Sequence, residues 1–335
     1  MRRCPTRIRL LSIAVFLGAL WWLTAAQGPP SAPAGKWYKG NLHTHTINSD
    51  GDSSPDEVVR WYKEHRYDFL VLTDHNYPTP VTGLNTVFGA EEKFLVVRGE
   101  EVTDHFGEKP IHVNAFHPGA FIAPQGGSSV LDTMQRNVNA IRTAQGVPSI
   151  NHPNFGWAIT TDDLRRLEND RLFEVYNGHP QVNNLGGGGA PGLEQMWDAV
   201  LSSGRLLHGI AVDDAHHFKQ WGPRSSNPGR AWVAVRARSL SADALRDALE
   251  RGDFYASTGV TLSDVSRLPN GLRLAIRAEN PFKYTTEFIG VNGKVLKTSY
   301  DNPATYTLAA EDRYVRARVI SSGGEMAWTQ PAFRE

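Results

Sequence analysis

The chain has 335 residues, of which 40% are hydrophobic and 21% charged, a composition that is typical of globular proteins and excludes a largely disordered chain. Four arginines lie in the first 26 residues, so the rest of the chain has 31 basic and 35 acidic residues and a net charge of −4. This charge gives no indication of a bulk basic surface of the kind that binds nucleic acids. The only cysteine, Cys4, lies in the same N-terminal segment, which excludes disulfides and thiol catalysis from the remainder.

Residues 1–27 have the features of a secretory signal peptide. The four arginines precede a 14-residue apolar run, Leu10–Leu23, and small residues follow it near Ala26. A membrane-spanning helix needs about 20 apolar residues, so a removable signal is favoured over a membrane anchor. We therefore predict a secreted or periplasmic protein that has no membrane segment once the signal is removed. A Pro- and Gly-rich linker is predicted at residues 28–36.

From residue 37 onward, short apolar runs alternate with amphipathic segments. The apolar runs are "YDFLVL", "KFLVV", "IHVNAF", "GVPSI", "LFEVY" and "LLHGIAV". Their nearly continuous hydrophobicity is typical of parallel strands that are covered on both faces. The segments "SSPDEVVRWYKEH", "SVLDTMQRNVNAIRTAQG", "PGLEQMWDAVLSSG" and "SADALRDALERG" show helical spacing instead. Repeated strand–helix units predict an α/β fold, either a barrel or an open sheet.

The polar residues that follow these runs favour the barrel. In a barrel the carboxyl ends of the strands converge at one mouth, whereas an open sheet spreads them along an edge. We predict that residues 37–259 form the barrel. From residue 260, short alternating strands with Asn-Gly and Gly-Gly turn signals predict a small antiparallel β module at residues 260–335. This module would either pack against the barrel or gate its mouth.

Nine imidazole or carboxylate side chains are predicted near strand ends, although each one alone would be interpreted as an ordinary solvated or hydrogen-bonded residue. The nine are His43, His45, Asp50, His75, Glu101, His112, His152, Asp214 and His216. Because side chains alternate along a strand, His43 and His45 would point to the same side of the sheet. Histidine and carboxylate ligands suit zinc, manganese and iron. Nine such groups at one mouth would conflict in charge and solvation without cations, so we predict a site for two or three divalent metal ions.

The motifs "NLHTHTINSDG", "YDFLVLTDHN", "RGEEVT", "IHVNAF", "INHP" and "VDDAHH" together resemble those of the polymerase and histidinol phosphatase (PHP) family of metallohydrolases. The resemblance covers residues 37–259 and implies a distorted, TIM-like (β/α)7 barrel with phosphoesterase-type activity. Two shorter phrases, "LERGDFYASTG" and "YVRARVISSGGEMAWTQPAF", resemble the carbaryl-hydrolase-like branch. That branch includes ester and amide hydrolysis as well as phosphoester hydrolysis.

The resemblance also implies how the nine ligands are shared. The first metal's ligands would be His43, His45, Asp214 and a bridging Glu101, the second's Glu101, His112 and His152, and the third's Asp50, His75 and His216. The residues that it implies for catalysis are Glu101, Asp214 and His216. Two choices stay open, namely Glu100 in place of Glu101 and His117 in place of His112. Asp213 and His217 are candidates to support the ligands or to move protons.

We predict hydrolysis of a small-molecule substrate, with an anionic phosphoester favoured, because a bound metal lowers the pKa of water from 15.7 to about 7. Two further functions stay open: hydrolysis of a carbamate, ester or amide at the same metals, and a non-catalytic metal- or carbohydrate-binding role.

Candidate substrate-binding residues are Arg224, Ser257 and Thr258, for which a solvated arginine and a polar turn are the simpler interpretations. The glycine run 186–189 lacks the context of a phosphate-binding loop and is predicted to be a loop or lid. Taken singly, His65, His105, His179 and His217 are interpreted as ordinary solvated or hydrogen-bonded histidines, and so is His117.

Overall fold

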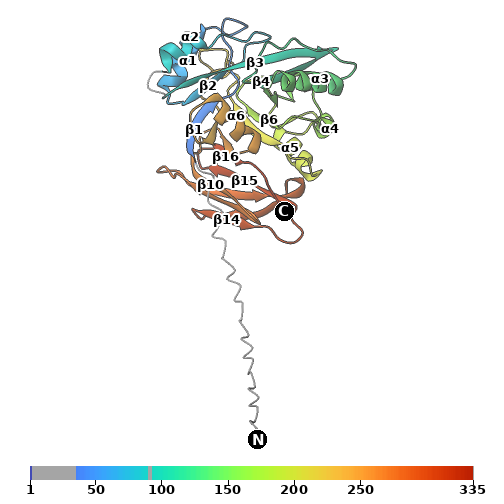
Figure 1. Cartoon of the computed structure of the whole chain (residues 1–335), viewed down its shortest axis with the longest axis vertical. Helices are drawn as coiled ribbons and strands as arrows, with labels where there is room; N and C mark the ends of the chain where they lie inside the picture. The colour runs from blue at the N-terminus through green and yellow to red at the C-terminus, as the bar shows by residue number, and fades with distance from the viewer. Residues whose placement is uncertain (2–34, 90–92, 335) are drawn as a thin grey trace.

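The computed structural model of the chain describes residues 1, 35–89 and 93–334 (Figure 1). Nearly all of the predicted signal peptide and linker lies outside these residues. Within the described ranges, no helix has both the length and the apolar character that crossing a membrane requires.

Helices form where the amphipathic segments were predicted. The α-helices in the described residues are α1 (Pro55–Glu64), α2 (Thr82–Phe88), α3 (Val130–Thr143), α4 (Thr161–Arg166), α5 (Leu193–Ser202) and α6 (Ala242–Arg251). Helices α1, α3, α5 and α6 confirm the four predicted segments. Helix α1 begins at Pro55, whose missing N–H costs nothing in a first helical turn. Helix α3 buries Met134, Val138 and Ile141, which follow one another at helical spacing on one face.

Most strands belong to one extended sheet. Its strands, in spatial order, are β13 (Val295–Ser299), β12 (Tyr284–Ile289), β15 (Tyr314–Ser321), β16 (Met326–Thr329), β9 (Phe254–Ser257), β8 (Trp232–Ala237), β1 (Lys36–Asn41), β2 (Phe69–Leu72), β3 (Leu95–Phe106), β4 (Lys109–Phe116), β5 (Val147–Ile150), β6 (Leu172–Asn177) and β7 (His208–Val212). A short strand, β17 (Ala332–Phe333), pairs with β15. The sheet is therefore mixed, with the predicted apolar runs at β2 to β7.

The prediction of uniformly parallel strands is wrong at β4. Strands β1, β2 and β3 are parallel, as are β5, β6 and β7, but β4 is antiparallel to both β3 and β5. The cause is the two-residue turn between β3 and β4, in which Gly107 has φ of +58°. So short a connection joins only antiparallel strands, since a parallel pair needs a crossover.

The two ends of the β1–β7 run meet beyond the strands themselves. Thr44, after β1, forms a parallel bridge with Ala215, after β7. The backbone N–H of His45 donates to the carbonyl of Ala215 at 3.0 Å, and that of Asp214 donates to the carbonyl of His43 at 3.1 Å. This contact joins the ends of the run at the predicted mouth. A barrel closed by seven paired strands stays a prediction, because the described strands β1 and β7 are not themselves paired.

The C-terminal residues form the predicted antiparallel β structure, drawn in orange and red in Figure 1. It includes a separate three-stranded sheet of β10 (Leu262–Leu268), β11 (Gly271–Ile276) and β14 (Ala304–Thr307). Strand β16 pairs with β9, with Trp328 opposite Ala256, so the large sheet continues from the N-terminal part into the module. Trp328 and Tyr314 share a hydrophobic core with residues of β6 and α5. The domain boundary after residue 259 stays a prediction.

Candidate metal centre

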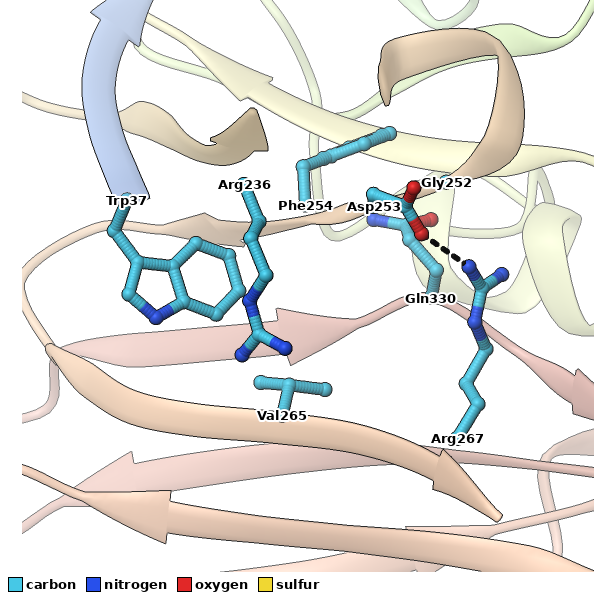
Figure 2. A pocket seen from close by; sticks show the side chains of 8 residues that line it. All are labelled: Trp37, Arg236, Gly252, Asp253, Phe254, Val265, Arg267 and Gln330. Carbon is cyan, nitrogen blue, oxygen red and sulfur yellow. Dashed lines mark hydrogen bonds and ion pairs between the residues drawn. The ribbon is translucent and has the colours of Figure 1, made fainter. Parts of the chain in front are cut away.

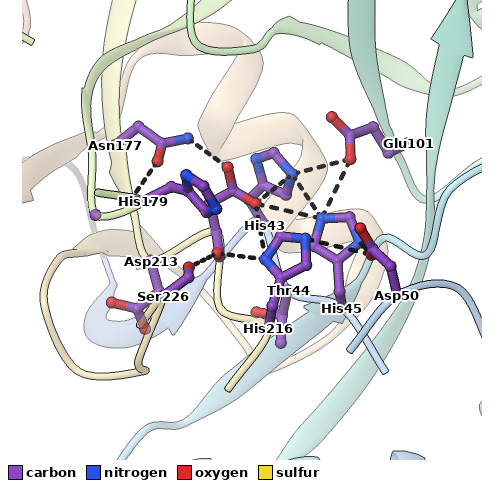
Figure 3. A network of polar contacts seen from close by, with 12 residues as sticks. His43, Thr44, His45, Asp50, Glu101, Asn177, His179, Asp213, His216 and Ser226 are labelled. Atoms are coloured by element: carbon purple, nitrogen blue, oxygen red, sulfur yellow. Dashed lines mark hydrogen bonds and ion pairs between the residues drawn. The ribbon is translucent and has the colours of Figure 1, made fainter. Parts of the chain in front are cut away.

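Four of the nine predicted ligands come from the paired segments beyond β1 and β7. Thr44 and Ala215 form the bridge, and His43, His45, Asp214 and His216 flank it. The rings of His45 and His216 stack, with their centroids 4.1 Å apart, and Figure 3 shows these histidines next to each other. His43 and His45 point to the same side, as "HTH" predicted, because their Nε2 atoms are 3.1 Å apart. Asp214 and His216 also face this side, next to His45.

The β3–β4 hairpin supplies Glu101 and His112 and orients Glu100 away from them. Glu101 lies opposite Asn114 and Thr103 lies opposite His112, so Glu101 and His112 are on the same face of the hairpin. Because β4 runs antiparallel to its neighbours, the first half of β4 reaches the mouth, which explains how a residue inside a strand joins residues at strand ends. Glu100 points to the opposite face, where the N–H of Ile122 donates to its carboxylate at 3.1 Å.

His117 and Asp213 also lie away from the centre. His117 faces Asp243 at 3.7 Å. The carboxylate of Asp213 accepts hydrogen bonds from the hydroxyl of Tyr62 and from the N–H groups of residues 229–231, at 2.7 to 2.9 Å. Burial raises the pKa of Asp213 to about 6. Because this carboxylate holds a loop in place and does not line the cavity, the structure gives no support to its proton-moving role.

Three buried ligand atoms face one another at the middle of the site (Figure 3). The Nε2 atoms of His43 and His45 are 3.1 Å apart, and each lies 3.2 Å from Oε2 of Glu101. All three side chains are fully buried. Ligands of a tetrahedral zinc ion at 2.0–2.1 Å are separated by about 3.3 Å, so this triangle has the size of one face of such a shell.

The remaining predicted ligands surround this triangle. Four sets of side chains have ligand atoms within 4.8 Å of one another: His43, His45 and Glu101; His75, Glu101 and His112; His43, His152 and Asp214; and His45, Asp50, His75 and His216. The fourth set contains the whole third shell implied by the family resemblance. The structure differs from the predicted assignment of ligands to metal ions at His152. This residue lies with His43 and Asp214 rather than with Glu101 and His112, although its Nε2 is 3.4 Å from Oε1 of Glu101.

Opposing charges shift the pKa values of the buried groups strongly. Burial by itself would lower the pKa of His43, but the carboxylates of Asp214, Glu101 and Glu174 raise it well above its ordinary value. Burial by itself would raise the pKa of Glu101, but His43, His75 and His112 lower it well below its ordinary value. Carboxylates buried this close to one another are stable in their charged form only with positive charge nearby.

The donor atoms fit divalent metal ions. The Nδ1–H of His43 donates to Glu174 at 2.6 Å, so in the neutral ring the Nε2 lone pair faces His45, Glu101 and Asp214. The buried Nδ1 of His112 lies 3.0 Å from Oε1 of Glu101 without forming a hydrogen bond. Lone pairs that face one another in a buried site are repulsive unless a proton or a metal cation lies between them, and imidazole with carboxylate suits zinc, manganese or iron.

The site opens into a cavity of 270 Å³. Its lining consists of Asp50, His75, Glu101, His112, His152, Phe155, His179, Gln181, Asp214, His216 and His217. Within the described part of the chain, no lysine or arginine lines this cavity. The backbone N–H groups of Gln181 and Ser226 donate to Nδ1 of His179 and His217, at 3.2 and 3.1 Å, so each neutral ring carries its proton on Nε2. Burial lowers the pKa of His179 to about 4.

Sequence reasoning missed three residues of this site. Glu174 and Asn177, both on β6, are buried behind the predicted ligands, and His179 lines the cavity after being interpreted as solvated. A signal for Glu174 was present, because it is the one charged residue in the apolar run "LFEVY". A carboxylate buried within an apolar strand is costly unless it is paired.

Asp74 supports the loop that carries Asp50. Its carboxylate accepts hydrogen bonds from the N–H of Thr46 at 2.7 Å and from the hydroxyl of Ser49 at 2.8 Å. Asp50 itself is 57% exposed and lies at the edge of the cavity, 3.3 Å from Nε2 of His216. The turn between residues 46 and 51 therefore swings Asp50 toward His216.

The three predicted substrate-binding residues do not line the cavity. Arg224 is exposed on the loop between β7 and β8. The hydroxyl of Ser257 donates to the carbonyl of Val260 at 2.7 Å, and the hydroxyl of Thr258 accepts from the N–H of Met326 at 2.9 Å. Both hydroxyls therefore stabilise the end of β9. The glycine run 186–189 lies in the loop between β6 and α5, as predicted, with positive φ at all four residues.

A smaller cavity of 160 Å³ lies between β1, β9 and β10, on the side of the C-terminal module (Figure 2). Its charged groups are already paired. Arg267 donates to Asp253 at 2.6 Å, and Arg236 donates to Asp264 at 2.8 Å while stacking on Trp37. This cavity therefore offers no unpaired charge to a ligand.

Comparisons with known proteins give few relatives in sequence. No family model matches the chain. The chain is similar to an uncharacterized protein of Methanocaldococcus jannaschii, with 29% identity over a stretch that covers 43% of this chain and 71% of that protein.

Two solved structures are similar to the chain at low sequence identity. One is a two-domain protein from Bacteroides vulgatus that contains a predicted PHP-like metal-dependent phosphoesterase, with a TM-score of 0.49 and 16% identity, covering 92% of this chain and 90% of that one. The other is a lesion-specific endonuclease from Pyrococcus furiosus, with a TM-score of 0.43 and 13% identity, covering 64% of this chain and 56% of that one. Membership of the PHP family and of its carbaryl-hydrolase-like branch both stay predictions from the sequence motifs.

Proposed function

We propose that this protein is a metal-dependent hydrolase of the PHP type whose favoured substrates are phosphoesters. The observation that carries the proposal is the buried triangle of His43, His45 and Glu101, whose ligand atoms lie 3.1 to 3.2 Å apart and face one another. The other predicted ligands surround it, which supports two or three divalent ions of zinc, manganese or iron.

Divalent ions held there would supply Lewis-acid activation of water and neutralise charge that develops on the substrate. Glu101 has the central position, because its Oε2 lies 3.1 to 3.2 Å from His43, His45 and His75 while its Oε1 faces His112 at 3.0 Å. It would bridge two ions.

The side chains of the cavity that are not predicted ligands would handle the substrate. His179 and His217, each with its proton on Nε2, would donate hydrogen bonds to substrate oxygens, and Phe155 would pack against an apolar group. Hydrogen-bond donors fixed around a reacting group stabilise charge that develops there, because they need no reorganisation during the reaction.

A second candidate function is hydrolysis of a carbamate, ester or amide at the same ions. The absence of lysine and arginine from the described lining of the cavity favours it, because a neutral substrate needs no cationic side chain. Export of the protein is part of the proposal on the strength of residues 1–27 alone.

The test is a substrate panel with purified protein loaded with manganese, zinc or iron. Aryl phosphomonoesters, aryl phosphodiesters, aryl esters and aryl carbamates are compared at equal concentration, with chelator-treated protein as the control. We expect turnover of a phosphoester that is lost on metal removal and restored by the metal. Turnover of carbamates or esters alone would favour the second candidate, and no metal-dependent turnover of any substrate would contradict both.

A further inference from the structure

Glu174 occupies a place that none of the nine predicted ligands has. It lies on β6, is fully buried and uses both carboxylate oxygens. Oε1 accepts a hydrogen bond from Nδ1 of His43 at 2.6 Å, and Oε2 accepts from the backbone N–H of His152 at 2.7 Å and from Nδ2 of Asn177 at 2.8 Å. One carboxylate thus contacts two of the predicted ligands directly.

Asn177 extends the contact to a third predicted ligand (Figure 3). Its Nδ2 also donates to Oδ2 of Asp214 at 3.0 Å, and its Oδ1 accepts from the backbone N–H of His179 at 2.7 Å. Because both Nδ2 contacts are to carboxylates, the orientation of the amide is determined. Glu174 and Asn177 therefore link three strand ends, those of β1, β5 and β7, from behind the cavity.

The backbone of two of these ligands requires such support. His152 has φ of +26° and Asp214 has φ of +50°, in the left-handed region that side chains other than glycine rarely adopt. Such conformations persist only where surrounding contacts enforce them. The N–H of His152 is held by Glu174, and the carboxylate of Asp214 is held by Asn177.

We propose that Glu174 is a positioning residue of the metal centre, which fixes the tautomer of His43 and, with Asn177, the placement of His152 and Asp214. With its Nδ1–H donated to Glu174, neutral His43 presents the lone pair of Nε2 toward His45 and Glu101. A histidine ligand whose second nitrogen donates to a carboxylate is a stronger and better oriented donor, and loss of such a partner weakens metal binding by about 10- to 100-fold. The inference rests on the proposed function in requiring that metal binds at this centre.

Two variants test the proposal in complementary ways. Glu174→Gln keeps the shape of the side chain but replaces one carboxylate oxygen with an NH₂ group. In one orientation of the amide the hydrogen bond from His43 is lost, and in the other the hydrogen bonds from His152 and Asn177 are lost. Glu174→Asp keeps the charge but shortens the side chain by one methylene, so the 2.6 Å contact to His43 is lost. The matched control is Glu100→Gln, because Glu100 is an equally buried carboxylate on β3 of the same sheet and faces away from the centre.

The measurement is metal affinity of the full chain, by competition of Zn²⁺ with a chelator and by elemental analysis after dialysis. Circular dichroism establishes that each variant is folded. We expect both Glu174 variants to bind the tightest ion about 10- to 100-fold more weakly than wild type, and Glu100→Gln to bind it as wild type does. If Glu174→Gln does not fold, the result for Glu174→Asp decides.

A further comparison shows whether Glu174 acts through His43. The substitution Glu174→Gln should lower zinc affinity by a smaller factor in a His43→Ala chain than in the wild-type chain, since His43→Ala removes one of the groups that Glu174 orients and leaves the contact with His152. Equal zinc affinity of wild type and both Glu174 variants would overturn the proposal while leaving the proposed function intact. A wild-type chain that binds no metal would overturn both.

Discussion

At the scale of single residues, the candidate metal centre depends on side chains with no substitute nearby. His45 and Glu101 are fully buried and each contributes to more than one of the ligand sets. Neither Glu100 nor His117 is placed to replace a lost ligand. The loss of either His45 or Glu101 therefore removes a ligand that the rest of the site cannot supply.

We predict that His45→Ala and Glu101→Ala abolish metal-dependent hydrolysis and lower the metal content while the protein stays folded. The expected loss in kcat is at least about 10²-fold, because the ions supply several kcal/mol of the transition-state stabilisation. Steady-state kinetics, elemental analysis and circular dichroism on the same samples check the three parts. Wild-type turnover in either variant would show that the site has been placed wrongly.

His208, at the start of β7, lies outside the candidate metal centre. This histidine is fully buried, and neither ring nitrogen has a hydrogen-bond partner among the described residues. Burial, with a smaller contribution from Arg267 and Arg171, lowers the pKa of His208 from 6.5 to about 3. The folded protein keeps this ring neutral while the unfolded chain binds a proton below pH 6.5. The free energy of unfolding therefore falls as the pH decreases from 6.5 toward 3.

We predict that His208→Leu makes the stability less dependent on pH. At about pH 5 the wild-type histidine costs about 2 kcal/mol relative to neutral pH, and the variant loses this component. Urea unfolding of both proteins at about pH 7.5 and about pH 5 checks the difference. Exposed His105→Gln is the control and should change with pH as wild type does. The prediction is wrong if the free energy of unfolding falls equally in wild type and His208→Leu between these two pH values.

At the scale of secondary-structure elements, local sequence patterns predicted most of the framework. The apolar runs became β2 to β7, and Pro55 marked the start of α1. The direction of β4 was missed, because an apolar run has the same pattern in a parallel or an antiparallel strand. Only the two-residue turn at Gly107 distinguishes the two.

The candidate site could be predicted where histidines and carboxylates recur at the ends of predicted strands. The alternation in "HTH" correctly predicted that His43 and His45 lie on the same side, and the family resemblance indicated Asp214 and His216, which lie beside them. Glu174 and Asn177 were not predicted, because their role depends on contacts with residues that follow β1, β5 and β7, and no local sequence pattern encodes such contacts. Which ligands would bind the same ion depends in the same way on distances between residues that are far apart in the sequence.

Helix α6 ends at a glycine that lies against the buried ring of His208. Gly252 follows the helix with φ of +70°, and a Cβ at this position would lie 2.5 Å from Nε2 of the buried His208. Gly204, after α5, also has positive φ (+90°), but a Cβ there would meet no atom within 4 Å. An alanine at residue 204 would therefore introduce backbone strain alone, whereas an alanine at residue 252 would introduce backbone strain and steric overlap.

We predict that Gly204→Ala costs about 1–2 kcal/mol, the cost of a left-handed conformation in a non-glycine residue. Gly252→Ala should cost more than this, because the ring of His208 must also move. Chemical denaturation of the two variants measures the difference. An equal loss of stability in both would show that the space around His208 relaxes freely.

At the scale of the whole molecule, the C-terminal module is joined to the rest by more than the β9–β16 pairing. Arg316 of β15 is 1% exposed and stacks on Trp197 of α5. Its Nε and one terminal nitrogen each donate to Asp198 of α5 at 2.7 Å. Arg318, two residues on, pairs with Glu194 and Glu287 but is half-buried. The module is thus joined to α5 by a buried ion pair, which favours the packing role over a gating role.

We predict that Arg316→Ala destabilises the protein by about 3–5 kcal/mol, because Asp198 is left buried and unpaired. Arg318→Ala, on the same strand and also removing a cation, should cost no more than about 1 kcal/mol, since its ion pairs are partly solvated. Thermal and urea unfolding of both variants check the contrast. Similar stabilities of the two variants would indicate that α5 and the module are not held together by Arg316.

The metal content of the purified full chain reports on whether the buried histidines and carboxylates at the mouth bind metal. The protein is produced with zinc, manganese and iron supplied, dialysed, and analysed for elements together with the Glu101→Ala variant. We predict two to three transition-metal ions per wild-type chain and fewer in the variant. A wild-type chain that contains no transition metal, and takes up none when reconstituted, would show that these side chains do not form a metal centre.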